Sequence, residues 1–251
     1  METTAAKRIS WRRIGLCLAI IFAAGYLATL VTDHVGVWYL ARKEARDPES
    51  SILPQRLPNI GVADLQGGQQ VNDFGYVFDL PWKVSKRTGA KTVSTFTLEN
   101  GTWVFIAAPQ SLPPGLASIE KDTPAETAAF RSVYGILTEG SRYDWMQAEL
   151  YSSPSDVSFW RSRSHNSRAL VMLMSKHAAI QNAKVIYTLS VGRFHGFQFG
   201  VPQQAHSPVN IRLFDANDHE LWIGLRRAPN GGSFTQEQIN AIMASIRPAT
   251  P

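Results

Sequence analysis

Apolar residues recur at every second position in several stretches of the chain, and this period is typical of β-strands. Residues 74–83, FGYVFDLPWK, predict a strand that ends near a proline. Residues 94–108, STFTLENGTWVFIAA, predict a hairpin, because Asn100-Gly101 separates two β-rich runs and both residues tolerate the positive φ of a type I′ turn. These stretches together predict antiparallel β-structure.

The same period returns in the final third of the chain. Residues 209–227 predict a second hairpin, and residues 183–202 predict one long strand or two joined strands. The second of these contains VGRFHGFQFGVP, which we interpret as strand with a bulge or bend near Gly192 or Gly196. In that interpretation one face carries Gly192, Gly196 and Gly200, and the opposite face carries Arg193, His195 and Phe197. The glycine face would allow a helix or a second backbone to approach closely.

Apolar residues spaced three or four apart predict helices elsewhere. Residues 123–140 begin with a capping box and end at a glycine, and residues 141–153 predict a second, short helix. Residues 166–180 suit a buried helix or a strand, and their Leu, Met and Ala content favours the helix. The last helix follows Thr235, with Gln238 at the capping-box position.

Strands, helices, strands and a final helix, joined by short turns, predict an α+β domain with helices packed on a mostly antiparallel sheet. The strand at 74–83, the hairpin at 94–108 and the closing ELWIGLRRA and FTQEQINAIMASIRP resemble the α/β/α sandwich of PsbP and Mog1-type proteins. This resemblance covers most of residues 60–248 and implies a binding or assembly role without catalysis. The helices at 141–180 depart from the family's pattern.

The N-terminal segment has a different character. Residues 14–31 contain no charged residue, and as a helix they span about 27 Å, close to the thickness of a bilayer's hydrocarbon core. Four basic residues precede them, which predicts a single transmembrane anchor of the inner (cytoplasmic) membrane, with a cytoplasmic N-terminus and an extracytoplasmic domain. The alternative is a signal peptide cleaved near Ala23-Ala24-Gly25, but the apolar run continues past that point.

The chain therefore divides into four predicted parts. A basic N-terminus at 1–13 precedes the anchor and its interfacial residues at 14–40, a Pro-containing linker occupies 41–60, and the soluble domain fills 61–251. The net charge is +5, but residues 1–46 alone hold seven Lys or Arg against three Asp or Glu. The domain is consequently close to neutral, and we expect no nucleic-acid partner.

Sequence signatures of chemistry are sparse. The histidines show no HxH, HxxxH or HExxH spacing, and residues 215–220, DANDHE, lack the later ligands of a calcium loop and suit a hairpin turn. We find no G-x-S-x-G, P-loop or dinucleotide-binding pattern. The sequence thus predicts no metal, no cofactor and no catalytic residues. The partners we expect are a bilayer, through residues 14–31, and an unidentified protein, for which the candidate contact residues are Arg193, His195 and Phe197.

Three alternatives stay open at this level. An enzyme, such as a hydrolase, would use His195 with Asp79 or Asp215. A carrier of a small molecule or lipid would hold it in a cavity lined by Trp82, Trp103, Phe197 and Trp222. The basic and aromatic stretch WRSRSHNSR at 160–168 suits an anionic-lipid or partner contact, or simply a solvated helix end.

Overall fold

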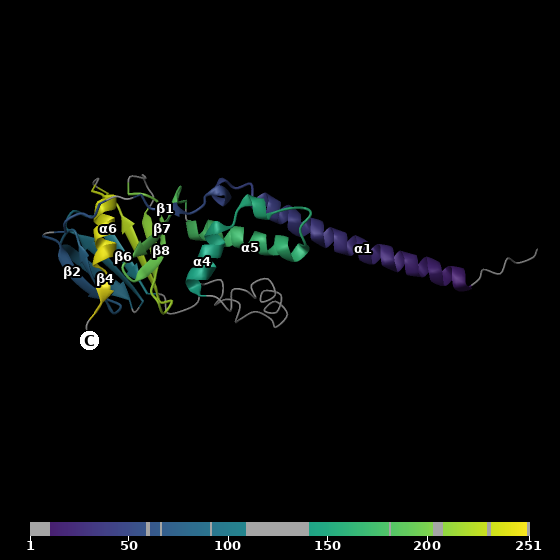
Figure 1. The fold of residues 1–251 in the computed structure, drawn as a ribbon, viewed down its shortest axis with the longest axis horizontal. Helices are drawn as coiled ribbons and strands as arrows, with labels where there is room; N and C mark the ends of the chain where they lie inside the picture. The colour runs from purple at the N-terminus through teal and green to yellow at the C-terminus, as the bar shows by residue number, and fades with distance from the viewer. Residues whose placement is uncertain are drawn as a thin grey trace, which may run out of the picture.

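A computed structural model describes residues 11–58, 61–65, 67–90, 92–108, 141–180, 182–202, 208–229 and 232–249. Side chains are described from Gly25 onward, apart from Leu30. The helix predicted at 123–140 lies outside this part of the chain. Figure 1 shows a sheet domain at one end, helices α4 and α5 beside it, and the long helix α1 extending away from the domain.

The main sheet has eight strands in the order β1-β7-β8-β9-β10-β6-β5-β4. All its neighbouring strands are antiparallel except β1 and β7, which are parallel. The strands are β1 (Gln55–Arg56), β4 (Val84–Ala90), β5 (Val93–Leu98), β6 (Trp103–Ala107), β7 (Ile186–Val191), β8 (Phe194–Phe199), β9 (Val209–Phe214) and β10 (Glu220–Arg226). A second sheet, in the order β11-β3-β2, contains β2 (Gln69–Asp73), β3 (Tyr76–Leu80) and β11 (Arg247–Pro248).

The described α-helices are α1 (Trp11–Glu44), α4 (Arg142–Tyr151), α5 (Arg163–Ile180) and α6 (Gln236–Ser245), with short 3₁₀ turns η1 (Pro48–Ser51) and η2 (Pro154–Asp156). The prediction of an α+β fold with a mostly antiparallel sheet and packed helices is confirmed. The helical interpretation of 166–180 is also confirmed, because α5 covers it completely.

The two faces of the main sheet bury separate cores because side chains alternate along each strand. One face packs with β2, β3 and α6 around residues such as Phe96, Ile211 and Ile239, which are almost completely buried. The other face of β7, β8 and β9 packs against α4 and α5 through a smaller cluster that includes Phe197 and Leu150. The main sheet is therefore a middle layer with helices on both sides.

The hairpin between β5 and β6 forms where the sequence places it, but its turn is not type I′. Gly101 has a φ of 82°, whereas Asn100 has no positive φ. Asn100 instead uses its side-chain oxygen to accept hydrogen bonds from the backbone and hydroxyl of Thr102, at 3.0 and 2.7 Å. A three-residue loop that ends with a glycine in the left-handed region replaces the expected two-residue loop.

VGRFHGFQFGVP belongs to two strands, so the predicted alternative of two joined strands is confirmed and the predicted single glycine-lined face is wrong. The chain reverses between β7 and β8 at Gly192, which has a φ of 56°, and Gly200 follows β8 with a φ of 82°. Gly196 is the one glycine of the three inside a strand. A Cβ atom there would lie 1.9 Å from the carbonyl oxygen of Arg212 on β9, so close backbone approach requires glycine at this position.

The predicted linker at 41–60 carries regular structure. Helix α1 continues without a break to Glu44, and Ala41 and Ala45 are buried in a cluster with Val157 and Leu173. Further on, η1 packs beside α5, and β1 extends the main sheet by pairing with β7. Apolar contacts and backbone hydrogen bonds thus hold this stretch on the domain.

Helices α1 and α5 lie side by side and run in the same direction (Figure 1), because Arg163 at the start of α5 pairs with Asp33 and His177 near its end pairs with Glu44. Among residues with described side chains, no helix is sufficiently long and apolar to cross a membrane. The predicted span is residues 14–31, and its backbone belongs to α1. The side chains of residues 14–24, which make up most of it, are not among those described.

Candidate functional site

A pocket of about 650 Å³ opens where several turns meet at one end of the main sheet. It is lined by the β2–β3 turn, the β7–β8 turn, the β9–β10 turn, the end of β6, the start of α4 and Pro248 of β11. Its polar lining residues are Tyr76, Arg142, Arg193, Asp215, Asn217, Asp218, His219 and Glu220. A volume of this size lies within the range of pockets that bind small ligands.

Asp215 is the central carboxylate of the pocket, and its side chain is almost completely buried. Its Oδ1 accepts from the backbone amides of Asn217 and His219, at 2.8 and 3.0 Å. Its Oδ2 accepts from Tyr76 Oη at 3.3 Å, His219 Nδ1 at 3.2 Å and Arg193 Nη2 at 3.5 Å. One carboxylate therefore closes the β9–β10 turn and connects it to β3 and to the β7–β8 turn.

These contacts determine how the acid and the phenol ionise. Burial acts to raise the pKa of Asp215, but hydrogen bonds from the backbone of His219 and Asn217 and from the His219 ring outweigh burial, so this pKa is lowered. Burial, together with the nearby Asp215 charge, raises the pKa of Tyr76. Asp215 is therefore an anion at neutral pH, while Tyr76 stays a neutral donor.

The other two carboxylates of the pocket are also satisfied within the protein. Asp218 accepts from the backbone amides of Arg142 and Tyr143, at 2.6 and 3.2 Å, and so caps the start of α4 from a turn 76 residues further along the chain. Glu220 forms an ion pair with Arg212 at 2.7 Å. The largest exposed polar groups at the pocket are the guanidinium of Arg193, which is a donor, and the ring of His219, whose second nitrogen is not used by Asp215.

The three predicted contact residues are divided between two environments. Arg193 lines the pocket and lies over the Phe194 ring, with its guanidinium carbon 5.6 Å from the ring centre. His195 and Phe197 point to the α4 side of the sheet, where the Tyr143 ring lies 4.2 Å from the His195 ring and 5.5 Å from the Phe197 ring, between centres. His195 and Phe197 are thus packing residues under α4 in the described structure.

The carboxylates predicted as partners of a catalytic His195 have other partners. Asp79 interacts with Gln70 at 3.2 Å and Arg247 at 3.6 Å, on the second sheet. The histidine that contacts Asp215 is His219. Tyr76, Arg142 and Asp218 also line the pocket, although the sequence did not single them out. They are far apart in the chain, only the fold brings them together, and no local motif marks them.

Three of the four aromatic residues proposed for a carrier's cavity lie apart, and the fourth, Trp222, packs edge-on against Phe105 with 5.4 Å between ring centres. Trp82 packs beside Phe234, with 5.3 Å between ring centres, next to the core that contains α6. Phe197 lies on the opposite face of the sheet, buried beneath α4. Trp103 is partly exposed on β6. The described residues therefore place these side chains in packing positions and at the surface.

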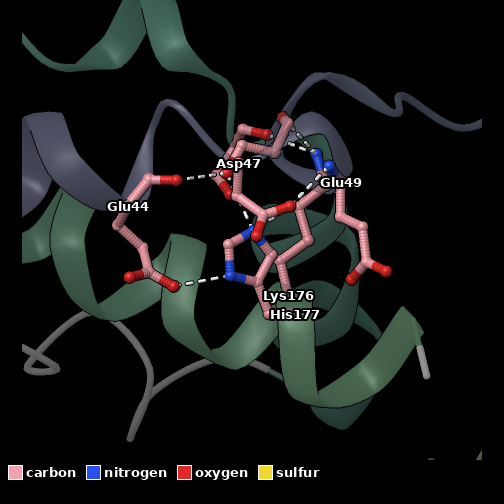
Figure 2. Close-up of polar contacts among 7 residues, drawn as sticks. Glu44, Asp47, Glu49, Lys176 and His177 are labelled. Atoms are coloured by element: carbon pink, nitrogen blue, oxygen red, sulfur yellow. Dashed lines mark hydrogen bonds and ion pairs between the residues drawn. The ribbon is translucent and has the colours of Figure 1, made fainter. Parts of the chain in front are cut away.

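A second polar cluster joins the end of α1 to α5 (Figure 2). His177 Nδ1 donates to Glu44 Oε1 at 2.5 Å, and its Nε2 lies 2.9 Å from Ser50 Oγ and 3.9 Å from Asp47 Oδ1. Ser50 Oγ donates to the Glu44 carbonyl oxygen at 2.9 Å. The last turn of α1 is thus hydrogen-bonded to η1 and to α5.

Lys176, beside His177, is completely buried. Its ammonium donates to the carbonyl oxygens of Ser50 and Ser152, at 3.1 and 2.6 Å, and burial lowers its pKa to about 8. Burial raises the pKa of Glu149 in α4 to about 7, although Trp145 Nε1 donates to its carboxylate at 2.8 Å. Lys176 thus connects η1 to the end of α4 through hydrogen bonds to both carbonyl oxygens.

In the described ranges, no group of three or more His, Cys, Asp or Glu side chains is arranged to hold a metal ion. No family model matches the chain, and no curated protein or solved structure shows significant similarity to it.

Proposed function

We propose that the chain is a single-pass protein of the inner (cytoplasmic) membrane, with a cytoplasmic N-terminus and an extracytoplasmic domain that binds a partner without catalysing a reaction. The observation that carries this proposal is the continuity of α1. The uncharged residues 14–31 belong to the same helix whose last turns, at Ala41, are buried in the domain. An anchor built in this way would hold the domain at a defined height above the bilayer.

Exposure along α1 supports the anchor. Tyr26, Leu27 and Val31 are 68%, 64% and 54% exposed. Large apolar side chains in consecutive helical turns are unfavourable in water and favourable in hydrocarbon. A bilayer around this part of α1 would cover them.

The pocket beside Asp215 supports the binding role. Its carboxylates already accept hydrogen bonds from the protein, whereas Arg193 is half exposed and His219 is largely exposed. We propose that the partner presents an acidic group to Arg193, because guanidinium donors bind carboxylates and phosphates, and that it also contacts the neighbouring ring of His219. The resemblance to PsbP and Mog1-type proteins, which stays a prediction, implies the same kind of role.

Extraction of membranes with alkaline carbonate tests the anchor. The full chain should remain in the membrane fraction, and protease added from the extracytoplasmic side should digest the domain while a tag before residue 14 survives. Phe22→Arg should reduce insertion, because an arginine at mid-span costs about 3 kcal/mol. The control Tyr39→Arg, outside the uncharged stretch, should insert normally. Complete extraction of the unmodified chain would refute the anchor.

Affinity capture of the tagged full chain from gently solubilised membranes tests the binding role. We expect a reproducible partner that is lost with Arg193→Ala or His219→Ala and kept with Arg227→Ala, which removes an exposed charge elsewhere. A partner captured equally by all variants would place the binding surface away from the pocket. Recovery of nothing above the detergent background would count against a binding protein.

A further inference from the structure

The loop before α5 lies directly against α1. Phe159 packs edge-on against Trp38, with ring centres 5.3 Å apart, and its carbonyl oxygen lies 2.9 Å from His34 Nε2. At the start of α5, Arg163 forms an ion pair with Asp33 at 3.1 Å. We call residues 158–161 of this loop the aromatic tip. These contacts place the aromatic tip beside residues 33–38 of α1.

The aromatic tip is held by a buried side chain. Asn166 of α5 is completely buried, and its amide donates to the carbonyl oxygens of Ser158 at 2.9 Å and Arg161 at 3.4 Å. Its side-chain oxygen accepts from the backbone amide of Ser158 at 3.2 Å. Both ends of the aromatic tip are thereby attached to α5, so the residues between them project in a defined direction.

Trp160, the residue at the centre of the aromatic tip, is 90% exposed, and its neighbour Phe159 is 42% exposed. The two rings contact each other edge-on, with 5.4 Å between centres. A braced loop that presents a tryptophan almost fully to solvent leaves a large apolar surface without cover. Tryptophan is enriched where one end of a side chain meets hydrocarbon and the other meets water.

The position of the aromatic tip along α1 matches that environment. His34 follows Val31, the last residue of the uncharged stretch, by three residues, which is about 4.5 Å along a helix axis. Each headgroup layer of a bilayer is roughly 5–8 Å thick. The aromatic tip would therefore lie within the headgroup layer if residues 14–31 span the hydrocarbon.

The charges around the aromatic tip are mainly positive. Arg161 is exposed and has no acidic partner among the described residues, and Arg163 remains largely exposed despite its pair with Asp33. Guanidinium groups bind phosphate oxygens through charge-assisted hydrogen bonds. A surface of phospholipid headgroups would satisfy both the arginines and the exposed rings.

We infer that the aromatic tip is a lipid-binding surface, with Trp160 inserted among the phospholipid headgroups next to α1 and Arg161 bound to lipid phosphate. This inference rests on the proposed membrane anchor. Because the junction at Glu44, Ser50 and His177 joins α1 to the domain, the second membrane contact would fix the orientation of the domain and the direction in which its pocket opens.

A fluorescent probe on the full chain tests this inference. Cys17, the only cysteine, is first replaced by Cys17→Ser. Trp160→Cys or the control Trp103→Cys is then added and labelled with a nitrobenzoxadiazole dye. Trp103 is 44% exposed on β6, away from α1 (Figure 1). Each labelled protein is reconstituted into phosphatidylcholine and phosphatidylglycerol vesicles, with or without a phospholipid that carries a nitroxide on its headgroup.

We expect a blue-shifted emission at position 160 and quenching by the nitroxide lipid about threefold stronger than at position 103, as for a side chain in the interfacial aromatic belt. Equal quenching at the two positions would overturn the inference. A blue shift without lipid quenching would also overturn it, because a second copy of the chain would then cover the aromatic tip. An unchanged thermal unfolding of the labelled protein confirms that the fold is intact.

Carbonate extraction of the same vesicles separates the two proposals. If the chain resists extraction and position 160 is not quenched, the lipid-binding surface is refuted and the anchor stands. If the chain is extracted, the anchor is refuted, and the inference that rests on it falls with it.

Discussion

His219 Nδ1 lies 3.2 Å from Asp215 Oδ2, while the imidazole as a whole is 70% exposed. One ring nitrogen is therefore engaged by a buried carboxylate, and the other is available at the pocket. The same carboxylate also accepts from Tyr76, the first residue of β3, and from Arg193 of the β7–β8 turn. Asp215 thus organises the pocket, and His219 is one of the groups it positions.

Removing the charge of Asp215 should destabilise the domain. Asp215→Asn keeps one acceptor oxygen but loses the anion that Tyr76, Arg193 and His219 contact, so we expect a loss of about 2 kcal/mol in the free energy of unfolding at pH 7. Since the folded pKa is lowered, the stabilisation is present above the unfolded pKa, about 3.9, and disappears as the pH falls through the folded value. Urea unfolding of both proteins across this pH range measures the difference.

The control for this substitution is Asp79→Asn, because Asp79 is partly exposed and forms a longer ion pair with Arg247. It should change the unfolding free energy by less than about 0.5 kcal/mol. An Asp215→Asn protein that unfolds like the unmodified chain at pH 7 would show that the hydrogen bonds to Asp215 contribute little.

Glu149 should make stability decrease with rising pH. Its pKa is raised from 4.5 to about 7, so between these values the folded state retains a proton that the unfolded state has released. Glu149→Gln removes this ionisation and keeps an acceptor for Trp145. We expect it to increase the free energy of unfolding by about 2 kcal/mol at pH 8 and to leave it nearly unchanged at pH 4.

Thermal unfolding at the two pH values measures this effect, with the exposed Glu99→Gln as the control. A gain of equal size at pH 4 and pH 8 would mean that Glu149 acts through packing and not through its ionisation.

Gln198 of β8 and Gln236 of α6 should be energetically coupled. Their buried amides exchange two hydrogen bonds, each 2.9 Å long. Either Gln198→Leu or Gln236→Leu leaves the other amide without these partners and should cost about 2 kcal/mol. The double variant should cost less than the sum of the two single costs, with a coupling of about 1 kcal/mol. Additive costs in urea unfolding would show that the pair acts independently.

Gly196→Ala should be severely destabilising. The added methyl group would meet the Arg212 carbonyl of the adjacent strand, and backbone cannot move aside as a flexible side chain can. We expect a loss of about 3 kcal/mol in the free energy of unfolding. Gly61→Ala is the matched control, because nothing lies within 4 Å of its added methyl group. Equal stability of the two variants would show that β9 shifts easily.

Local sequence signals located most of the described elements. The capping box of Thr235 and Gln238 marks the start of α6, where the backbone N–H of Gln238 donates to the Thr235 hydroxyl at 3.3 Å. Alternation located β3 and the β5–β6 and β9–β10 hairpins. Period two could not separate one long strand from two strands joined by a tight turn, because Gly192 suits both, and the turn removes the single glycine-lined face predicted for VGRFHGFQFGVP.

The sequence predicted much less of the candidate site than of the fold. Arg193 was identified as a candidate and does line the pocket, but His195 and Phe197 pack under Tyr143. Tyr76 and Asp218 carry no local mark of their roles, since each interacts with a residue more than seventy positions away. Contacts of that kind follow from strand order and are invisible to spacing rules.

The sequence by itself determined the α+β class, the positions of most turns and helix starts, and the uncharged stretch at 14–31, because these depend on periodicity and on interactions between near neighbours. Tertiary structure alone decided that α1 continues into the domain, that Asp215 connects its turn to β3 and to the β7–β8 turn, and that Trp160 stands exposed beside α1. Those features depend on which distant segments pack together, and that choice is made by the burial of the whole chain and not by any single segment.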